Sequence, residues 1–167
     1  MKRVLIVGNS GGGKSTLARR LGDQLGLPVI HLDVLFWKPG WVESDDTDFR
    51  ANIALALQQP TWVCDGDFSS SLDLRAPLAD TIIWIDQPRW LCLIRAIWRI
   101  MKYRRENRPD MADGCRETFD LQFYSYIWSW NRNRRARFKA SLVTHGAQAH
   151  VVQLRSDREI AAFLAGA

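Results

Sequence analysis

Residues 8–15 are Gly-Asn-Ser-Gly-Gly-Gly-Lys-Ser, which fits the pattern G-x-x-x-x-G-K-[ST] without a mismatch. An apolar run at residues 4–7 precedes this stretch, and leucines at helical spacing follow it at positions 17, 21 and 25. A buried strand, a glycine-rich loop and a helix are therefore expected in that order. This order decides the fold class, because it is the context in which the pattern forms a phosphate-binding loop.

Each residue type in this loop suits the binding of a triphosphate. Glycines let the backbone curl so that successive N–H groups point inward, and the start of the next helix adds its free N–H groups and its dipole. Lys14 is expected to reach the β- and γ-phosphates, and the Ser15 hydroxyl to bind Mg²⁺. The sequence therefore predicts ATP and Mg²⁺ as ligands, with a nucleotide site made of Gly8, Asn9, Ser10, Gly11, Gly12, Gly13, Lys14, Ser15 and Thr16.

The composition fits one folded domain over residues 1–167. A chain of 167 residues, 47% of them hydrophobic, is large enough to bury a substantial core. No apolar run approaches the ~20 residues of a membrane span, and the apolar stretch near the start is too short for a signal peptide. The three cysteines are far apart in the sequence, which suggests neither a disulfide framework nor a zinc site. We therefore expect a cytoplasmic protein without a membrane partner.

Strand-like and helix-like segments alternate along the rest of the chain. Short apolar runs predict strands at residues 4–7, 29–32, 61–64, 81–85 and 151–154. Helical spacing and capping residues predict helices at 15–25, from 45 or 46 to 58, at 73–79, from 88 to 101, over one long stretch from 119 past 130, and at 157–164. This alternation indicates an α/β fold with a parallel sheet and helices on both faces, whose ligands bind outside the carboxyl ends of the strands.

Four carboxylates fall where predicted strands end, namely Asp33, Asp65, Asp67 and Asp86. Asp65 directly follows an apolar strand, so it is the favoured carboxylate for Mg²⁺, with Asp67 as the alternative. Asp33 is a candidate to orient or deprotonate the hydroxyl of a phosphate acceptor, although a turn or helix cap explains it equally well. Asp86 is expected to be mainly structural.

Positive charge is concentrated in one part of the chain. Residues 89–139 hold 13 Lys or Arg and 5 Asp or Glu, whereas the remainder is mildly acidic. Residues 103–114 are rich in arginine and interrupted by Pro109 and Gly114, which predicts a mobile loop. The basic region can be a solvated helical face, a phosphate-binding lid or a nucleic-acid-binding patch.

Eight tryptophans are many for this length, and most of them are expected to pack in the core. Trp37 and Trp41 differ because they flank Pro39-Gly40, which predicts a loop. We therefore expect these two indoles to be candidates for lining a substrate pocket.

The phosphate loop, Asp65-Gly66, and the pair Arg95 and Arg99 together resemble the adenylate kinase-like nucleotide kinases. The resemblance implies a P-loop NTPase three-layer α/β/α sandwich, with a five-stranded parallel sheet in the order 2-3-1-4-5 and a basic lid at residues 103–117. It also implies that Arg95 stacks on the adenine of ATP and that Arg99 contacts the transferring phosphates. The stretch Asp65-Gly66-Asp67-Phe68 departs from the Asp-Gly-Phe-Pro-Arg signature of that family. It lacks the arginine that would hold an acceptor phosphate.

A more extensive resemblance is to the DNA topology modulation proteins of the FlaR type. It extends along nearly the whole chain and is carried by His31-Leu32-Asp33, by residues 36–41, by Asp65-Gly66, by residues 86–89, by residues 108–115 and by Ile127-Trp128. The name of that group implies an effect on DNA topology, whereas its motifs imply a kinase fold.

The leading hypothesis is a P-loop kinase that transfers the γ-phosphate of ATP to a small acceptor. In this hypothesis the catalytic residues are Lys14, Arg99, Asp33 and Arg108, the metal ligands are Ser15 and Asp65, and further lid charge comes from Arg104 and Arg105. The alternative is a nucleotide-dependent nucleic-acid-binding protein, suggested by the basic segment and its aromatic residues.

Overall fold

The computed structural model describes residues 1–103, 108, 110–116 and 118–167, apart from the side chains of residues 131–133. A five-stranded sheet forms its centre, in the order β2-β5-β1-β6-β7, and every neighbouring pair is parallel. The strands are β1 (Arg3–Gly8), β2 (Val29–His31), β5 (Trp62–Asp65), β6 (Thr81–Ile85) and β7 (His150–Leu154). This confirms the predicted sheet, because these five strands are the first to fifth predicted strands in the order 2-3-1-4-5.

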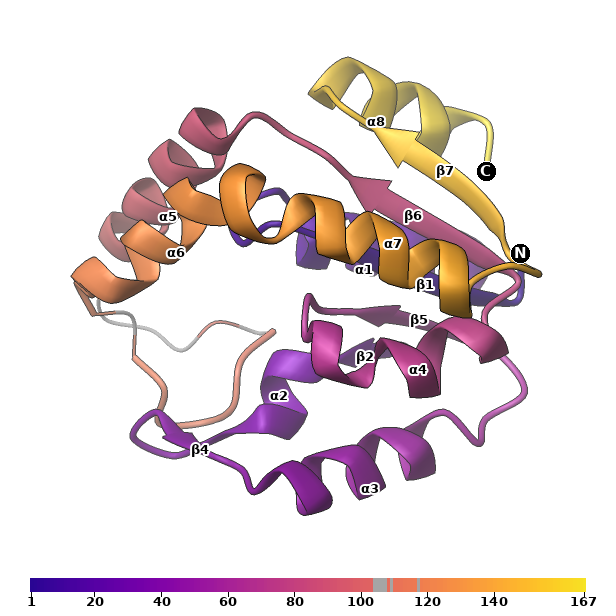
Figure 1. The fold of residues 1–167 in the computed structure, drawn as a ribbon, viewed down its shortest axis with the longest axis horizontal. Coiled ribbons are helices and arrows are strands. Elements are labelled where there is room, and N and C mark those ends of the chain that lie inside the picture. The colour runs from indigo at the N-terminus through magenta and orange to yellow at the C-terminus, as the bar shows by residue number, and fades with distance from the viewer. Residues whose placement is uncertain (104–107, 109, 117) are drawn as a thin grey trace.

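Helices cover both faces of the sheet (Figure 1). The side chains of β1 accordingly alternate between two cores, one on each face. Val4 and Ile6 pack with α1 (Lys14–Leu25) and α8 (Asp157–Ala165). Leu5 and Val7 point to the opposite face, which is covered by α3 (Asp46–Ala56), α4 (Leu72–Arg75) and α7 (Arg135–His145). The two layers of helices and the sheet make the predicted three-layer sandwich.

A third, smaller cluster joins two helices at one end of the sandwich. Helix α5 (Arg89–Tyr103) packs against α6 (Leu121–Asn133) through Cys92, Ala96, Tyr124 and Ile127. The prediction of one long helix from residue 119 was wrong. Asp120 caps α6 by accepting a hydrogen bond from the Gln122 N–H, and the backbone breaks at Arg134. This break lets α6 pack on α5 and α7 pack on the sheet.

The segment after β2 also differs from its prediction. The last paired residue of β2 is His31, opposite the end of β5 at Asp65, so Leu32 has no strand to pair with. The chain instead forms the short helix α2 (Leu32–Phe36), which buries Leu32, and then a hairpin of β3 (Trp37–Lys38) and β4 (Val42–Glu43). Two 3₁₀ turns, η1 (Ser69–Ser71) and η2 (Ala76–Leu78), flank α4. Among the described helices, none has both the length and the apolar character needed to cross a membrane.

Candidate active site

The glycine-rich loop runs from the end of β1 to the start of α1 and is wedged between neighbouring backbones. Gly8 has φ 138°, and a Cβ there would lie 2.2 Å from the carbonyl oxygen of Ile85. Gly11 has φ 78°, and its Cβ would lie 2.2 Å from the carbonyl oxygen of Cys92. Only glycine fits these two positions, so the loop geometry depends on contact with β6 and α5.

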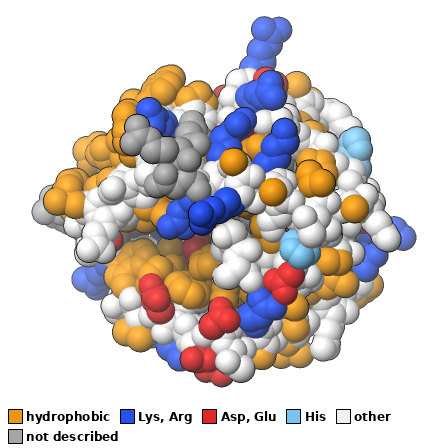
Figure 2. Space-filling model, viewed as in Figure 1, with side chains coloured by type: hydrophobic (Ala, Val, Ile, Leu, Met, Phe, Trp, Pro, Cys, Tyr) orange, Lys and Arg blue, Asp and Glu red, His pale blue; other side chains and the backbone are white. Residues whose placement is uncertain are grey.

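A cavity of about 750 Å³ opens beside this loop and gathers most of the predicted site. All four residues predicted to be catalytic line it, namely Lys14, Asp33, Arg99 and Arg108. Ser10, Gly11, Gly13, Ser15 and Thr16 of the loop line it too, as does Arg95. Figure 2 shows a recess near α2 and α6, with hydrophobic side chains inside and both signs of charge at its rim. The fold therefore brings together residues that are up to 98 positions apart in the sequence, from Ser10 to Arg108.

Lys14 and Asn9 stabilise the loop from inside. The Lys14 Nζ donates a hydrogen bond to the Asn9 carbonyl oxygen at 3.1 Å, so the ammonium lies against the loop that is expected to hold phosphates. Asn9 is 2% exposed, and its Nδ2 donates to the carbonyl oxygen of Ile127 at 3.1 Å. The Asn9 side chain therefore anchors the loop to α6, which leaves only its backbone for a nucleotide.

Asp33 lies in the first turn of α2 rather than at the end of a strand, which corrects the predicted position. Its side chain faces the cavity. Burial raises the pKa of Asp33, Lys14 and Arg108 oppose this shift, and the charge of Asp65 adds to it. The result is a carboxylate with a raised proton affinity beside the phosphate-loop lysine.

The two candidates for the metal carboxylate have different surroundings, and neither lines the cavity. Asp65 is 2% exposed, and its Oδ1 lies 2.6 Å from His31 Nδ1. Burial lowers the pKa of His31, but the hydrogen bond and charge of Asp65 outweigh it and the net shift is upward. Asp67 accepts a hydrogen bond from the Tyr126 hydroxyl at Oδ2, while its buried Oδ1 has no partner among the described residues.

Arg75 supports this carboxylate segment and was not singled out from the sequence. Its side chain is fully buried and donates to the carbonyl oxygens of Gly66 at 3.1 Å, Asp67 at 3.2 Å and Phe68 at 2.9 Å. Because the guanidinium satisfies three successive carbonyls, it holds the turn that follows β5 in one shape. The only sequence signal was one arginine among the otherwise apolar residues 74–79, which is a weak signal.

Asp110 is a second site residue that sequence reasoning missed. It forms a buried ion pair with Arg108, and the two residues are 6% and 7% exposed. Burial raises the pKa of Asp110, but the ion pair with Arg108 and a hydrogen bond from the Ser15 hydroxyl lower it to about 2. This carboxylate therefore links the predicted lid to the phosphate loop. The predicted lid residues Arg104 and Arg105 lie outside the described residues.

The later part of the predicted lid packs against the β3–β4 hairpin. The Gly40 N–H donates to the Gly114 carbonyl at 3.3 Å, and the Trp41 indole N–H donates to the Arg116 carbonyl at 2.7 Å. Cys115 is 1% exposed. The arginine-rich loop predicted at residues 103–114 is thus followed closely by contacts with a hairpin that the sequence did not predict.

Arg95 and Arg99 lie on the α5 side of the cavity. Arg95 forms an ion pair with Asp157 at the start of α8, and both residues also line a smaller hollow of about 290 Å³ with Gly12 and Ile160. The Arg99 guanidinium carbon lies 5.6 Å from the centre of the Phe123 ring. Arg95 thus stands at the boundary of the two hollows, one turn of helix away from Arg99.

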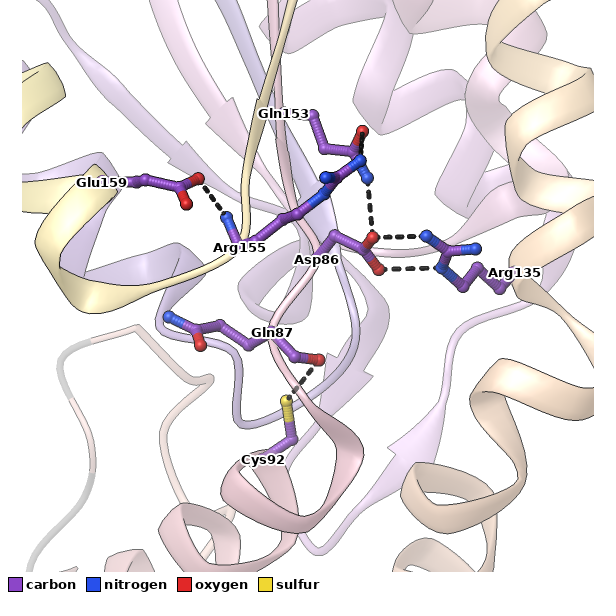
Figure 3. A network of polar contacts seen from close by, with 7 residues as sticks. All are labelled: Asp86, Gln87, Cys92, Arg135, Gln153, Arg155 and Glu159. Atoms are coloured by element: carbon purple, nitrogen blue, oxygen red, sulfur yellow. Dashed lines mark hydrogen bonds and ion pairs between the residues drawn. The ribbon is translucent and has the colours of Figure 1, made fainter.

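Asp86, Arg134 and Arg135 make contacts within the fold. Asp86 accepts hydrogen bonds from Arg135 at 3.0 and 2.6 Å and from Gln153 at 2.6 Å (Figure 3). Burial raises the pKa of Asp86, but the Arg135 and Gln153 contacts lower it below the usual value. Arg134 lies over the Tyr126 ring at 4.4 Å. Arg134 and Arg135 each therefore contact another side chain of the fold, and Asp86 has the structural role predicted for it.

No protein-family model and no curated protein matches the chain. Solved structures match it over nearly its whole length. Shikimate kinase from Acinetobacter baumannii in complex with shikimate has a TM-score of 0.58 and 16% identity, covering 99% of this chain and 90% of that one. Shikimate kinase from Bacteroides thetaiotaomicron has a TM-score of 0.52 and 15% identity, with 99% and 95% covered. Deoxyadenosine kinase from M. mycoides with bound dCTP has a TM-score of 0.51 and 10% identity, with 98% and 97% covered.

The chain has a P-loop kinase-like fold. At identities of 10–16% the likeness shows the fold alone, so the substrates of these enzymes do not transfer to this chain.

Proposed function

We propose that this protein is a kinase that transfers the γ-phosphate of ATP to a hydroxyl group of a small acceptor. The proposal rests mainly on one observation: Lys14 and Asp33 line the same cavity. A phosphate-loop lysine supplies charge to the transferring phosphoryl group, and a carboxylate of raised pKa beside it suits a base for the acceptor hydroxyl.

The nucleotide would lie along the loop and α5. Backbone N–H groups of residues 8–16 and the start of α1 would hold the phosphates. Arg95 would stack on the adenine, which requires it to share or give up its ion pair with Asp157. The smaller hollow beside Arg95 offers apolar contacts from Leu17 and Ile160 for the same ring.

The residues present also fit a magnesium ion. Ser15 supplies a hydroxyl, Asp65 ends the strand next to β1, and the buried Oδ1 of Asp67 has no partner among the described residues. We favour Ser15 and Asp65 as the residues that would hold Mg²⁺, with Asp67 as the alternative. When bound, the ion would neutralise charge on the β- and γ-phosphate oxygens.

The transfer itself requires little covalent help from the protein. The acceptor oxygen bonds to the γ-phosphorus, the bond to the β,γ-bridging oxygen breaks, ADP leaves, and Asp33 takes the hydroxyl proton. Lys14, Arg99 and Arg108 balance the charge on the phosphoryl oxygens. Residues 103–117 would act as the lid that excludes water, with Arg108 exchanging Asp110 for phosphate as the lid closes.

The nucleic-acid alternative, including an effect on DNA topology as in the FlaR-type proteins, draws on the excess of positive charge in residues 89–139. Arg134 and Arg135 weaken it, because both are engaged within the fold. Binding of duplex DNA that depends on ATP and persists in salt would favour this alternative. Binding that disappears with salt would reflect charge alone.

The proposal is tested by measuring ADP formation from Mg·ATP in the presence of hydroxyl compounds, with mass spectrometry of the acceptor. We expect at least one acceptor to gain a phosphate with the native protein and not with the Lys14→Ala variant. If no acceptor raises ADP formation above the level of the variant, and a non-hydrolysable ATP analogue fails to bind, the kinase proposal is wrong.

A further inference from the structure

The side of the cavity formed by α2 and the β3–β4 hairpin has a distinctive composition. Residues 32–43 contribute four side chains to the cavity, which we call the acceptor wall: Asp33, Trp37, Trp41 and Glu43. Two are carboxylates and two are indoles, and this segment contributes no cation to the lining. The cations of the cavity come from other parts of the chain, namely Lys14 and Arg19 of α1, Arg95, Arg99 and Lys102 of α5, and Arg108.

Trp41 is held in a conformation that opposes its residue type. Its φ is 63°, and among the described residues it is the only non-glycine residue in the left-handed region. Such a conformation costs about 1–3 kcal/mol and persists only where surrounding contacts maintain it. Here the indole N–H donates to the Arg116 carbonyl at 2.7 Å, and the adjacent Gly40 N–H bonds to Gly114.

The two indoles of the wall are fixed against each other. The rings of Trp37 and Trp41 are 5.3 Å apart and inclined at 74°, and Trp37 also meets Phe36 edge to face at 4.9 Å. Both tryptophans are only partly buried and both line the cavity. Rigid, half-exposed indoles of this kind are good platforms for stacking a flat ring.

The charges of the wall select against an anionic acceptor. A phosphate or carboxylate on the acceptor would face Asp33 and Glu43 without a cation from the same segment. Arg108 lies in the same cavity but is paired with Asp110. Lys14 and Arg19 line the cavity too, but both belong to α1: the charge of Lys14 acts on Asp33, and the charge of Arg19 acts on His31. Carboxylates instead suit acceptors that carry hydroxyl and N–H donors.

We propose that the acceptor wall binds a planar ring compound that bears a hydroxyl group and N–H donors but no anionic group, which is the chemistry of an unphosphorylated nucleoside. This inference rests on the proposed kinase function. Trp37 and Trp41 hold the base, Glu43 accepts from its N–H groups, and Asp33 receives the proton of the sugar hydroxyl. The products are ADP and a nucleoside monophosphate.

The test fills the nucleotide site first, so that adenine binding does not interfere. With Mg²⁺ and AMP-PNP at saturation, thymidine, thymidine 5′-monophosphate and shikimate are titrated by calorimetry. We expect thymidine to bind at least about tenfold more tightly than either anion. Tighter binding of the monophosphate or of shikimate would overturn the inference.

Variants of the wall make the assignment specific. Trp41→Gly removes the indole, and glycine adopts the positive φ of this position without strain. Thymidine should therefore bind about tenfold more weakly to this variant, while AMP-PNP binds as before. Glu43→Lys should shift the preference toward the monophosphate. Trp90→Ala removes an exposed indole that does not line the cavity and should change neither affinity. If Trp41→Gly and Trp37→Ala both leave thymidine binding intact, the wall is not the acceptor site.

The two proposals fail in different ways. If AMP-PNP binds to the native protein and not to Lys14→Ala, but no nucleoside binds, only the acceptor class is wrong. If AMP-PNP does not bind to the native protein, the kinase proposal itself fails.

Discussion

The phosphate loop and the β3–β4 hairpin line the same cavity, but they carry left-handed backbone conformations on different kinds of residue. In the loop, Gly8, Gly11 and Gly13 have positive φ, which glycine adopts without a steric penalty. In the hairpin, Gly40 is followed by Trp41 at φ 63°, where the Cβ makes the conformation unfavourable. The loop therefore presents its backbone groups without strain, whereas the hairpin holds Trp41 in a strained backbone conformation.

This difference separates two tasks within one site. Backbone N–H groups recognise phosphates and carry no information about the acceptor. Side chains such as Trp37, Trp41 and Glu43 are where one acceptor can be distinguished from another. Substitutions at the two ends of the cavity should therefore separate phosphate transfer from acceptor choice.

The largest effect is expected at the phosphate end. Lys14→Ala should reduce turnover by about 10³-fold, because its ammonium is the positive charge that lies next to the phosphate loop and would stabilise the transferring phosphoryl group. Stability should hardly change, since the Lys14 ammonium donates its hydrogen bond to a single carbonyl, that of Asn9. Steady-state ADP formation and urea unfolding check the two parts, with Lys139→Ala on α7 as the exposed control. Turnover equal to the native level would remove the loop from the reaction.

Asp33→Asn comes second, with an expected loss of about 10²-fold or more in transfer and no change in AMP-PNP affinity. A base acts when it is deprotonated, and the pKa of Asp33 is raised. Native turnover should therefore fall as the pH drops through this raised pKa, and the variant should lose that limb of the pH profile. Asp48→Asn, an exposed residue of α3, is the control. A profile unchanged in Asp33→Asn would limit this residue to a structural role in the first turn of α2.

The sequence predicted the phosphate end of the cavity better than the hairpin end. The loop, its lysine and the sheet order were predictable because they depend on local spacing and on alternation along the chain. The hairpin was not, because its strands have two residues each and are stabilised by contacts with residues 114–116. Asp110 and Arg75 were missed for a related reason: their roles come from partners that only the fold brings close.

Asp110 links the phosphate loop to the predicted lid through Ser15 and Arg108. Asp110→Asn should lower the free energy of unfolding at neutral pH by roughly 2 kcal/mol, which corresponds to a pKa lowered from 3.8 to about 2. A carboxylate whose folded pKa is depressed stabilises the fold above its unfolded pKa and loses this contribution as the pH falls through the folded value. The difference between native protein and variant should thus be full above pH ~4 and disappear toward pH ~2.

Urea unfolding at a series of pH values measures this difference. Asp113→Asn serves as the control, because it is an exposed carboxylate of the same segment. A pH-independent difference would mean that the loss comes from packing rather than from the charge of Asp110.

The metal carboxylate should give a smaller effect at the phosphate end. Asp65→Asn should raise the Mg²⁺ concentration required for half-maximal turnover by about tenfold, and more than Asp67→Asn does. The reason is that Asp65 ends β5 directly beside β1, whereas Asp67 lies two residues further along and bonds Tyr126. Titrating Mg²⁺ against turnover for both variants decides between them. An equal or reversed order would assign the ion to Asp67, whose Oδ1 has no described partner.

The smallest effect isolates the strain in the hairpin. At an ordinary strand position alanine is more stable than glycine, because glycine loses more backbone entropy on folding. At Trp41 the order should reverse: Trp41→Gly should be about 1 kcal/mol more stable than Trp41→Ala, because both variants lose the indole but only alanine keeps the strained Cβ. Val42→Gly and Val42→Ala, one residue further into β4, form the matched pair in which alanine should be the more stable. Urea unfolding of the four variants gives both differences. If Trp41→Ala is as stable as Trp41→Gly, the hairpin stores no strain at Trp41, and its contrast with the glycine loop is one of residue type alone.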